Sequence, residues 1–243
     1  MSSADLDAAL ADIDTVFNGF ASPNETGCGR CHLPEETAYL RTPYTRVPLD
    51  VLRMYLFEVS DHFDDHAAAM RRLLPQGARA MAESTLDGVG WGFHGLSRVD
   101  WRSWPAEQAT AVEAFVHAWW QDVLATPEPP YAVAEVFETC AAIVRSVTPL
   151  LDRWHAAPVA DVHLARCVDR WLESLLVDRS PFFWFLYGEE AAVPELQSWL
   201  ARHAPARLGA QGEPGLAIQA ELLALPYDER WAHPYWDSAS ATN

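Results

Sequence analysis

The stretch AEQATAVEAFVHAWWQDVLA, residues 106–125, carries the clearest helical pattern in the chain. Its large apolar side chains recur every three or four residues, at Val112, Phe115, Val116, Trp119, Trp120, Val123 and Leu124. That spacing places them on one face of an α-helix, where together they bury a large apolar surface. The stretch therefore predicts a helix that belongs to the core.

The same period continues on both sides of this helix. It predicts long helices over residues 132–156 and 161–177, and shorter ones at residues 190–205 and 213–225. Nearer the N-terminus, Leu6, Leu10 and Ile13 repeat it. No window shows sustained alternation of apolar and polar residues with hairpin turns. We therefore expect an all-α fold, either an antiparallel helical bundle or a HEAT-like helical array with an N-terminal Cys-x-x-Cys loop.

Length and composition limit the class of protein. The 243 residues can form one helical domain over residues 1–243, with a sub-boundary near residues 86–104. The net charge of −17 disfavours nucleic acid and membrane partners and leaves a protein partner, of basic character, as the expectation. Every basic residue is Arg, so chemistry that needs a Lys is excluded. The N-terminus shows no secretion signal, and we expect a cytoplasmic protein.

The most chemically specific motif is Gly27-Cys28-Gly29-Arg30-Cys31-His32. Two thiols separated by two residues can hold one soft metal ion, and zinc is the usual one. The same residues also match a c-type haem attachment site, with His32 as the axial ligand. Haem attachment needs export, which the N-terminus does not indicate. A thioredoxin-like redox pair would need a βαβ pattern around the motif, and the flanking sequence is helical and turn-like instead. Two interpretations of the motif remain, a zinc site or two free thiols in a glycine-rich turn.

A single Cys-x-x-Cys pair supplies only half of a tetrahedral zinc site. A second cluster, Glu58, His62 and His66, lies on one face if the helix there is continuous, because the residues are four apart. His62 or His66 can complete the site of the two cysteines, or the cluster can hold a separate metal. The alternative is a helix start, at which Asp64 and Asp65 are favoured by the helix dipole. The predicted metal ligands are therefore Cys28, Cys31, His32, His62 and His66.

The other notable residues have simpler interpretations. Cys140 and Cys167 fall on apolar helix faces, where a free cysteine behaves as a small buried hydrophobic residue. The glycine-rich segment of residues 88–95 ends near His94 and indicates a loop between two helices. His94 is a third candidate, after His62 and His66, for completing the cysteine site.

Several short motifs resemble a group of bacterial helical proteins without an assigned activity. The motifs are Phe20 with the Cys-x-x-Cys pair, Pro-Glu-Glu at 34–36, Leu-Leu-Pro at 73–75 and Trp-Pro at 104–105. The resemblance covers about the first half of the chain and implies the Cys-x-x-Cys pair but no reaction. Members of the group often have a His where this chain has Arg72, so no ligand role is carried over to that position.

These observations lead to three hypotheses for function. The first is a helical protein-interaction or scaffold protein with a structural zinc site. The second is a metal-dependent enzyme that uses Cys28, Cys31 and one of His62, His66 or His94. The third is an acidic inhibitor or immunity-type protein that covers a basic partner. The first ranks highest because no complete catalytic set is recognisable in the sequence.

Overall fold

A computed structural model of the chain describes residues 2–89, 94–183 and 189–240. All regular elements in these ranges are helices, which confirms the all-α class, while the choice between a bundle and a HEAT-like array stays a prediction. The helices are α1 (Ala4–Val16), α2 (Pro34–Arg41), α3 (Leu49–Leu56), η1 (Ser60–His62), α4 (His66–Ala82), α5 (His94–Ser97), η2 (Trp101–Ser103), α6 (Ala106–Ala125), α7 (Val133–Val144), α8 (Thr148–Leu151), α9 (Pro158–Leu175), α10 (Glu189–His203), α11 (Pro205–Ala210), α12 (Pro214–Leu222), α13 (Tyr227–Trp231) and α14 (Tyr235–Ser240).

Contacts within the chain define two compact units. The first comprises residues 1–123 and 128–145, and the second comprises residues 124–127 and 146–243. The described residues of the predicted sub-boundary, 86–89 and 94–104, belong to the first unit.

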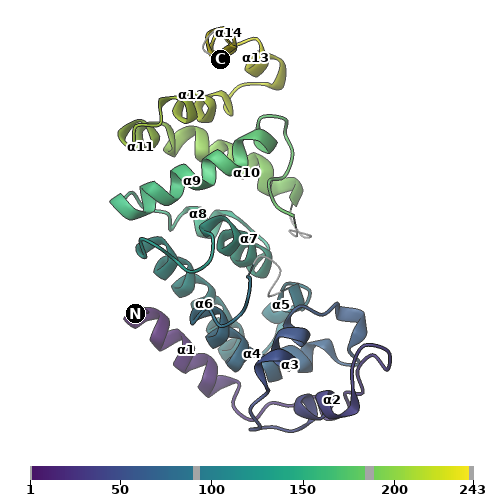
Figure 1. Ribbon diagram of the computed structural model, residues 1–243. Helices are drawn as coiled ribbons and strands as arrows, with labels where there is room; N and C mark the ends of the chain where they lie inside the picture. The colour runs from purple at the N-terminus through teal and green to yellow at the C-terminus, as the bar shows by residue number, and fades with distance from the viewer. Residues whose placement is uncertain (1, 90–93, 184–188, 241–243) are drawn as a thin grey trace. The chain divides into compact units, whose positions relative to one another are not determined.

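The first unit is organised around α4, which packs against α1, α2, α3 and α5 (Figure 1). The apolar face of α6 is buried as predicted, and its Phe115 and Trp120 are fully enclosed. Trp120 meets Phe137 of α7 edge-on, with ring centroids 5.4 Å apart. Trp101 is also buried, and its indole nitrogen donates to the carbonyl oxygen of Ile143 at 2.9 Å. These aromatic contacts form the core of the unit.

The helix predicted over residues 132–156 is interrupted in the structure. Its first part, α7, ends at Val144, because Arg145 adopts a left-handed conformation with φ of 55°. The guanidinium of Arg145 donates to the carbonyl oxygen of Ser97, which holds this turn in place. A short helix, α8, then follows. The apolar stripe was predicted correctly, but the backbone reversal at Arg145 leaves no sequence signal because arginine rarely adopts a positive φ.

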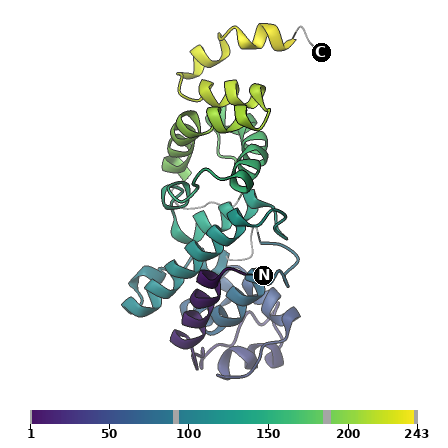
Figure 2. The ribbon, with the colours of Figure 1, turned by 90° about the vertical axis from the view of Figure 1, so that its left-hand side faces the viewer.

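The second unit consists of α8 to α14, the green to yellow part of Figure 2. Within it α12 packs against α9, α10 and α11, and α11 packs against α9 and α10. The stripe predicted for residues 161–177 forms the buried face of α9, including Trp171 and Cys167. Burial raises the pKa of the Cys167 thiol, and that of Cys140 in the first unit, as expected for cysteines in an apolar core. Among the described residues, no helix combines the length and the apolar character that crossing a bilayer requires.

Candidate metal centre

The Cys-x-x-Cys motif forms a tight turn in the long connection between α1 and α2. The backbone N–H groups of Cys31 and His32 both donate to the carbonyl oxygen of Cys28, at 3.0 and 2.9 Å. Gly27 enters the turn with φ of +68°, and a Cβ added there would lie 2.6 Å from the Cγ2 atom of Thr37. Only glycine fits this position without strain, so the turn depends on it.

The structure brings one histidine to the two thiols. The Sγ atoms of Cys28 and Cys31 and a ring nitrogen of His62 all lie within 4.8 Å of one another. In a tetrahedral zinc site the ligand atoms are about 3.5 to 3.8 Å apart, because the bonds are about 2.0 to 2.3 Å long. The three donors therefore need only a small closure to hold one ion. Cys31 is exposed, and Cys28 and His62 are partly exposed.

The carboxylate of Glu58 lies next to His62. Its Oε1 atom is 2.8 Å from Nδ1 of His62, and its side chain is only 16% exposed. This Nδ1 is buried and makes no hydrogen bond, and the nearby carboxylate leaves Nε2 as the nitrogen that can bind a metal ion. Metal-bound histidines commonly use this arrangement, in which a carboxylate fixes the tautomer and raises the basicity of the ring. The spacing of four residues predicted Glu58 as a metal donor beside His62, and did not predict its contact with Nδ1 of His62.

His32 is fully buried and uses both of its ring nitrogens inside the protein. Its Nδ1 accepts the backbone N–H of Cys28 at 3.0 Å, so the proton of the neutral ring lies on Nε2. That Nε2 donates to the Oε2 atom of Glu58 at 3.1 Å. In this arrangement both ring nitrogens of His32 already have partners, so a metal or a haem iron could bind His32 only after one of these hydrogen bonds breaks. It forms a second close group with Glu58 and His62, within 4.8 Å.

His66 belongs to neither donor group among the described residues. The helix that would align it with Glu58 and His62 is not continuous, because α3 ends at Leu56 and α4 starts at His66 itself. Its ring stacks on Phe63, with centroids 5.2 Å apart. Burial, and then the positive charge of Arg98, lower the pKa of His66 to about 4. The side chain of His94 lies outside the described residues.

The buried carboxylate of Glu25 connects the thiol turn to the start of α4. Oε1 accepts the backbone N–H groups of Gly27 and Asp64 at 2.9 and 3.0 Å, and Oε2 accepts that of Asp65 at 3.3 Å. Asp64 in turn accepts the backbone N–H and the hydroxyl of Thr26. These bonds join positions almost 40 residues apart in sequence and bring Cys28 to η1. Glu25 was not predicted as a site residue, since no local sequence pattern marks it.

The two thiols differ in acidity. Hydrogen bonds from the backbone of Arg30 and Cys31, followed by one from the Cys31 side chain, lower the pKa of Cys28. The hydrogen bond to Cys28, together with desolvation, raises the pKa of Cys31. A thiolate at Cys28 is the form that binds metal, so the turn prepares at least one ligand for an ion.

Comparison with known proteins gives no further constraint. No protein-family model, curated protein or solved structure matches the chain. The geometry of the site is therefore the basis for the function proposed below.

Proposed function

We propose that this chain binds one zinc ion through Cys28, Cys31 and His62, and that it works as a helical protein-interaction or scaffold protein. The observation that carries the proposal is the group of three donors, with the Glu58 carboxylate 2.8 Å from Nδ1 of His62. Two thiolates and one imidazole favour zinc over the hard ions magnesium and calcium, which prefer oxygen ligands.

A structural role for the metal follows from where its ligands lie. Cys28 and Cys31 belong to a connection of irregular backbone, whereas His62 belongs to a short helix after α3. An ion bound to all three would fix that connection to the helical body. Because such a site exists only in the folded chain, the binding free energy would add to the free energy of unfolding. At free zinc 100-fold above the Kd, this amounts to about 2.7 kcal/mol.

The first experiment measures bound metal. We expect purified protein to contain about one zinc per chain, by plasma mass spectrometry, and the Cys28→Ser, Cys31→Ser double variant to contain none. The double variant should also melt at a lower temperature than the zinc-loaded protein. Cys167→Ala is the matched control, since it removes a thiol from the second unit and should keep the metal. If the native protein neither contains zinc nor takes it up on reconstitution, the proposal fails.

A metal-dependent enzyme is the second candidate, and one observation favours it. The donor group has three members, which is the number that catalytic zinc sites use while the fourth position holds water. X-ray absorption spectroscopy of the zinc protein separates the two cases. A fourth sulfur or nitrogen ligand supports the structural role. An exchangeable oxygen ligand, combined with hydrolysis of an ester or amide substrate that stops on chelation, supports the enzyme.

A further inference from the structure

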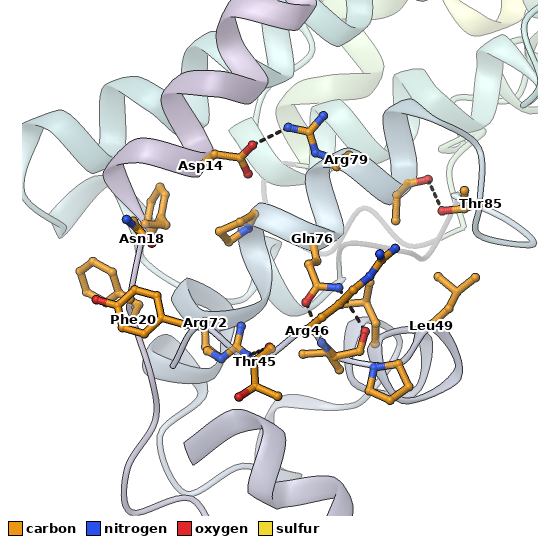
Figure 3. A pocket seen from close by; sticks show the side chains of 18 of the residues that line it. Asp14, Asn18, Phe20, Thr45, Arg46, Leu49, Arg72, Gln76, Arg79 and Thr85 are labelled. Atoms are coloured by element: carbon orange, nitrogen blue, oxygen red, sulfur yellow. Dashed lines mark hydrogen bonds and ion pairs between the residues drawn. The ribbon is translucent and has the colours of Figure 1, made fainter. Parts of the chain in front are cut away.

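A cavity of about 830 Å³ lies in the first unit, separate from the three proposed metal ligands. Its walls come from the end of α1 and the residues after it, from the segment before α3, and from one face of α4 (Figure 3). Cavities of this volume commonly hold small molecules. Tyr44, Leu49 and Pro75 contribute apolar surface to the wall.

The charges on the wall are unusual for such an acidic protein. Arg46, Arg72 and Arg79 face two carboxylates, those of Asp14 and Glu83. Arg79 pairs with both carboxylates. Arg46 and Arg72 remain, and the wall has a net charge of +1 while the whole chain has −17. The cavity is thus a local positive site.

Arg72 is the strongest indication that an anion binds there. Its side chain is buried, with 8% of the residue exposed. Nε donates to the carbonyl oxygens of Tyr39 and Thr42 at 3.1 and 3.3 Å, and Nη2 donates to that of Thr45. Nη1 of Arg72 has no hydrogen-bond partner among the described residues. No Asp or Glu side chain in the described part of the chain forms an ion pair with the guanidinium. A buried cation without a counter-ion is costly, and a bound anion would remove this cost.

Arg46 supplies the second cation. Its side chain is exposed, and it has no hydrogen-bond or ion-pair partner in the part of the chain that the structure describes. The backbone next to it is fixed, since Gln76 of α4 accepts the N–H of Val47 at 2.8 Å and donates to its carbonyl oxygen at 3.1 Å. Figure 3 shows Arg46 and Gln76 across the cavity from Asn18 and Phe20. The backbone that bears the Arg46 side chain is therefore held in place by α4.

We propose that this cavity binds a small organic anion, in which a carboxylate, sulfonate or phosphate group is joined to an apolar body. Arg72 would pair with the charged group, and Arg46 would add a second positive charge to the cavity wall. The apolar body would lie against Tyr44, Leu49 and Pro75. An inorganic anion alone would leave most of the cavity and all of its apolar wall without contacts, which is why the ligand class includes the apolar body.

The test uses two fluorescent probes that differ only in charge. Anilinonaphthalene sulfonate has an aromatic body and a sulfonate, and phenylnaphthylamine has the same rings without the charge. Each is titrated into the full-length, metal-loaded protein. We expect the sulfonate to bind at one site per chain, and Arg46→Glu to raise its Kd by at least about tenfold, because a charge-assisted contact becomes a repulsion. The Kd of the neutral probe should change by less than about twofold.

Arg46→Glu is suited to this test because the exposed side chain makes no contacts that the fold needs. Arg166→Glu is the matched control, since Arg166 is an exposed arginine on α9 of the second unit and its replacement changes the net charge equally. Octanoate and inorganic phosphate are then compared as competitors. Displacement by octanoate but not by phosphate supports the proposed class. Failure of the sulfonate to bind, an equal effect of both variants, or displacement by phosphate alone would overturn the proposal.

Discussion

Glu58 is the residue on which the candidate metal centre depends most. Its two carboxylate oxygens contact His62 at 2.8 Å and His32 at 3.1 Å, so one side chain lies against the third ligand and supports the thiol turn. We expect Glu58→Gln to weaken zinc binding by about 10- to 100-fold, since losing such an orienting carboxylate typically has an effect of this size. Competition with a chromophoric zinc chelator measures the change.

Asp61→Asn provides the control for Glu58→Gln. Asp61 is an exposed carboxylate next to His62, and replacing it with Asn removes one negative charge, as Glu58→Gln does. Its replacement should alter zinc affinity by less than about threefold, since exposed charges near a site interact weakly with it. Equal losses in the two variants would mean that general electrostatics, and not the orientation of His62, determines the affinity.

His66 should make the protein sensitive to acid. Its pKa falls from 6.5 to about 4 in the folded chain, chiefly because the ring is buried. Above pH 6.5 the ring is neutral in both states, and the folded state keeps its full stability. As the pH falls from 6.5 to about 4, the unfolded chain takes up a proton that the folded chain does not. The free energy of unfolding then decreases by up to about 1.4 kcal/mol per pH unit. Because solvent reaches part of the ring, the actual decrease is smaller than this upper limit.

The measurement is the free energy of unfolding by urea between pH 4 and pH 7. We expect His66→Gln to flatten the pH dependence relative to the native chain, since glutamine does not titrate. His155→Gln, at an exposed histidine of the second unit, is the control and should keep the native slope. The buried His163 is present in all three proteins, so its own contribution cancels. A slope unchanged in His66→Gln would contradict the assignment.

At the scale of elements, the turn before Cys28 is the most constrained backbone near the site. Gly27 has φ of +68°, and a Cβ there would lie 2.8 Å from Nδ1 of His32. Gly27→Ala should lower the free energy of unfolding by at least about 1–2 kcal/mol from backbone strain, and should also weaken zinc binding. Gly29→Ala, two residues later, is the matched control because a Cβ there meets nothing within 4 Å. It should change stability by less than about 0.5 kcal/mol, as measured by urea denaturation.

The helices were largely predictable because each buries a continuous apolar face. On α6, all seven residues of the predicted stripe are buried, and on α1 Leu6, Leu10 and Ile13 are buried as expected. Periodicity reports such burial directly. It does not report where the backbone turns, so the break at Arg145 was missed.

The candidate metal centre was only partly predictable, for the same reason. The Cys28–Cys31 pair is local and carries a recognisable spacing. The choice of His62 over His66 depends on the interruption between α3 and α4, which sequence spacing alone does not reveal. The position of the thiol turn also depends on Glu25, whose partners lie almost 40 residues away. Long-range polar contacts of this kind leave no periodic signal.

At the scale of the whole molecule, the division into two units makes a prediction about metal removal. All three proposed ligands, Glu58 and Glu25 belong to the first unit. Under the proposal, the metal links the connection between α1 and α2 to the segment around η1. Loss of the ion should therefore loosen both segments. The helices of the second unit share none of these contacts, so their local stability should not depend on the metal.

Hydrogen–deuterium exchange with mass spectrometry tests this prediction on the full chain, with and without a zinc chelator. We expect amides of residues 20–66 to exchange faster after zinc removal, and those of α9 and α10 to keep their rates. The Cys28→Ser, Cys31→Ser variant should reproduce the chelated pattern without chelator, which separates loss of the site from side effects of the reagent. If protection in α9 and α10 fell together with that of residues 20–66, the two units would unfold as one cooperative body and the metal would stabilise the whole chain.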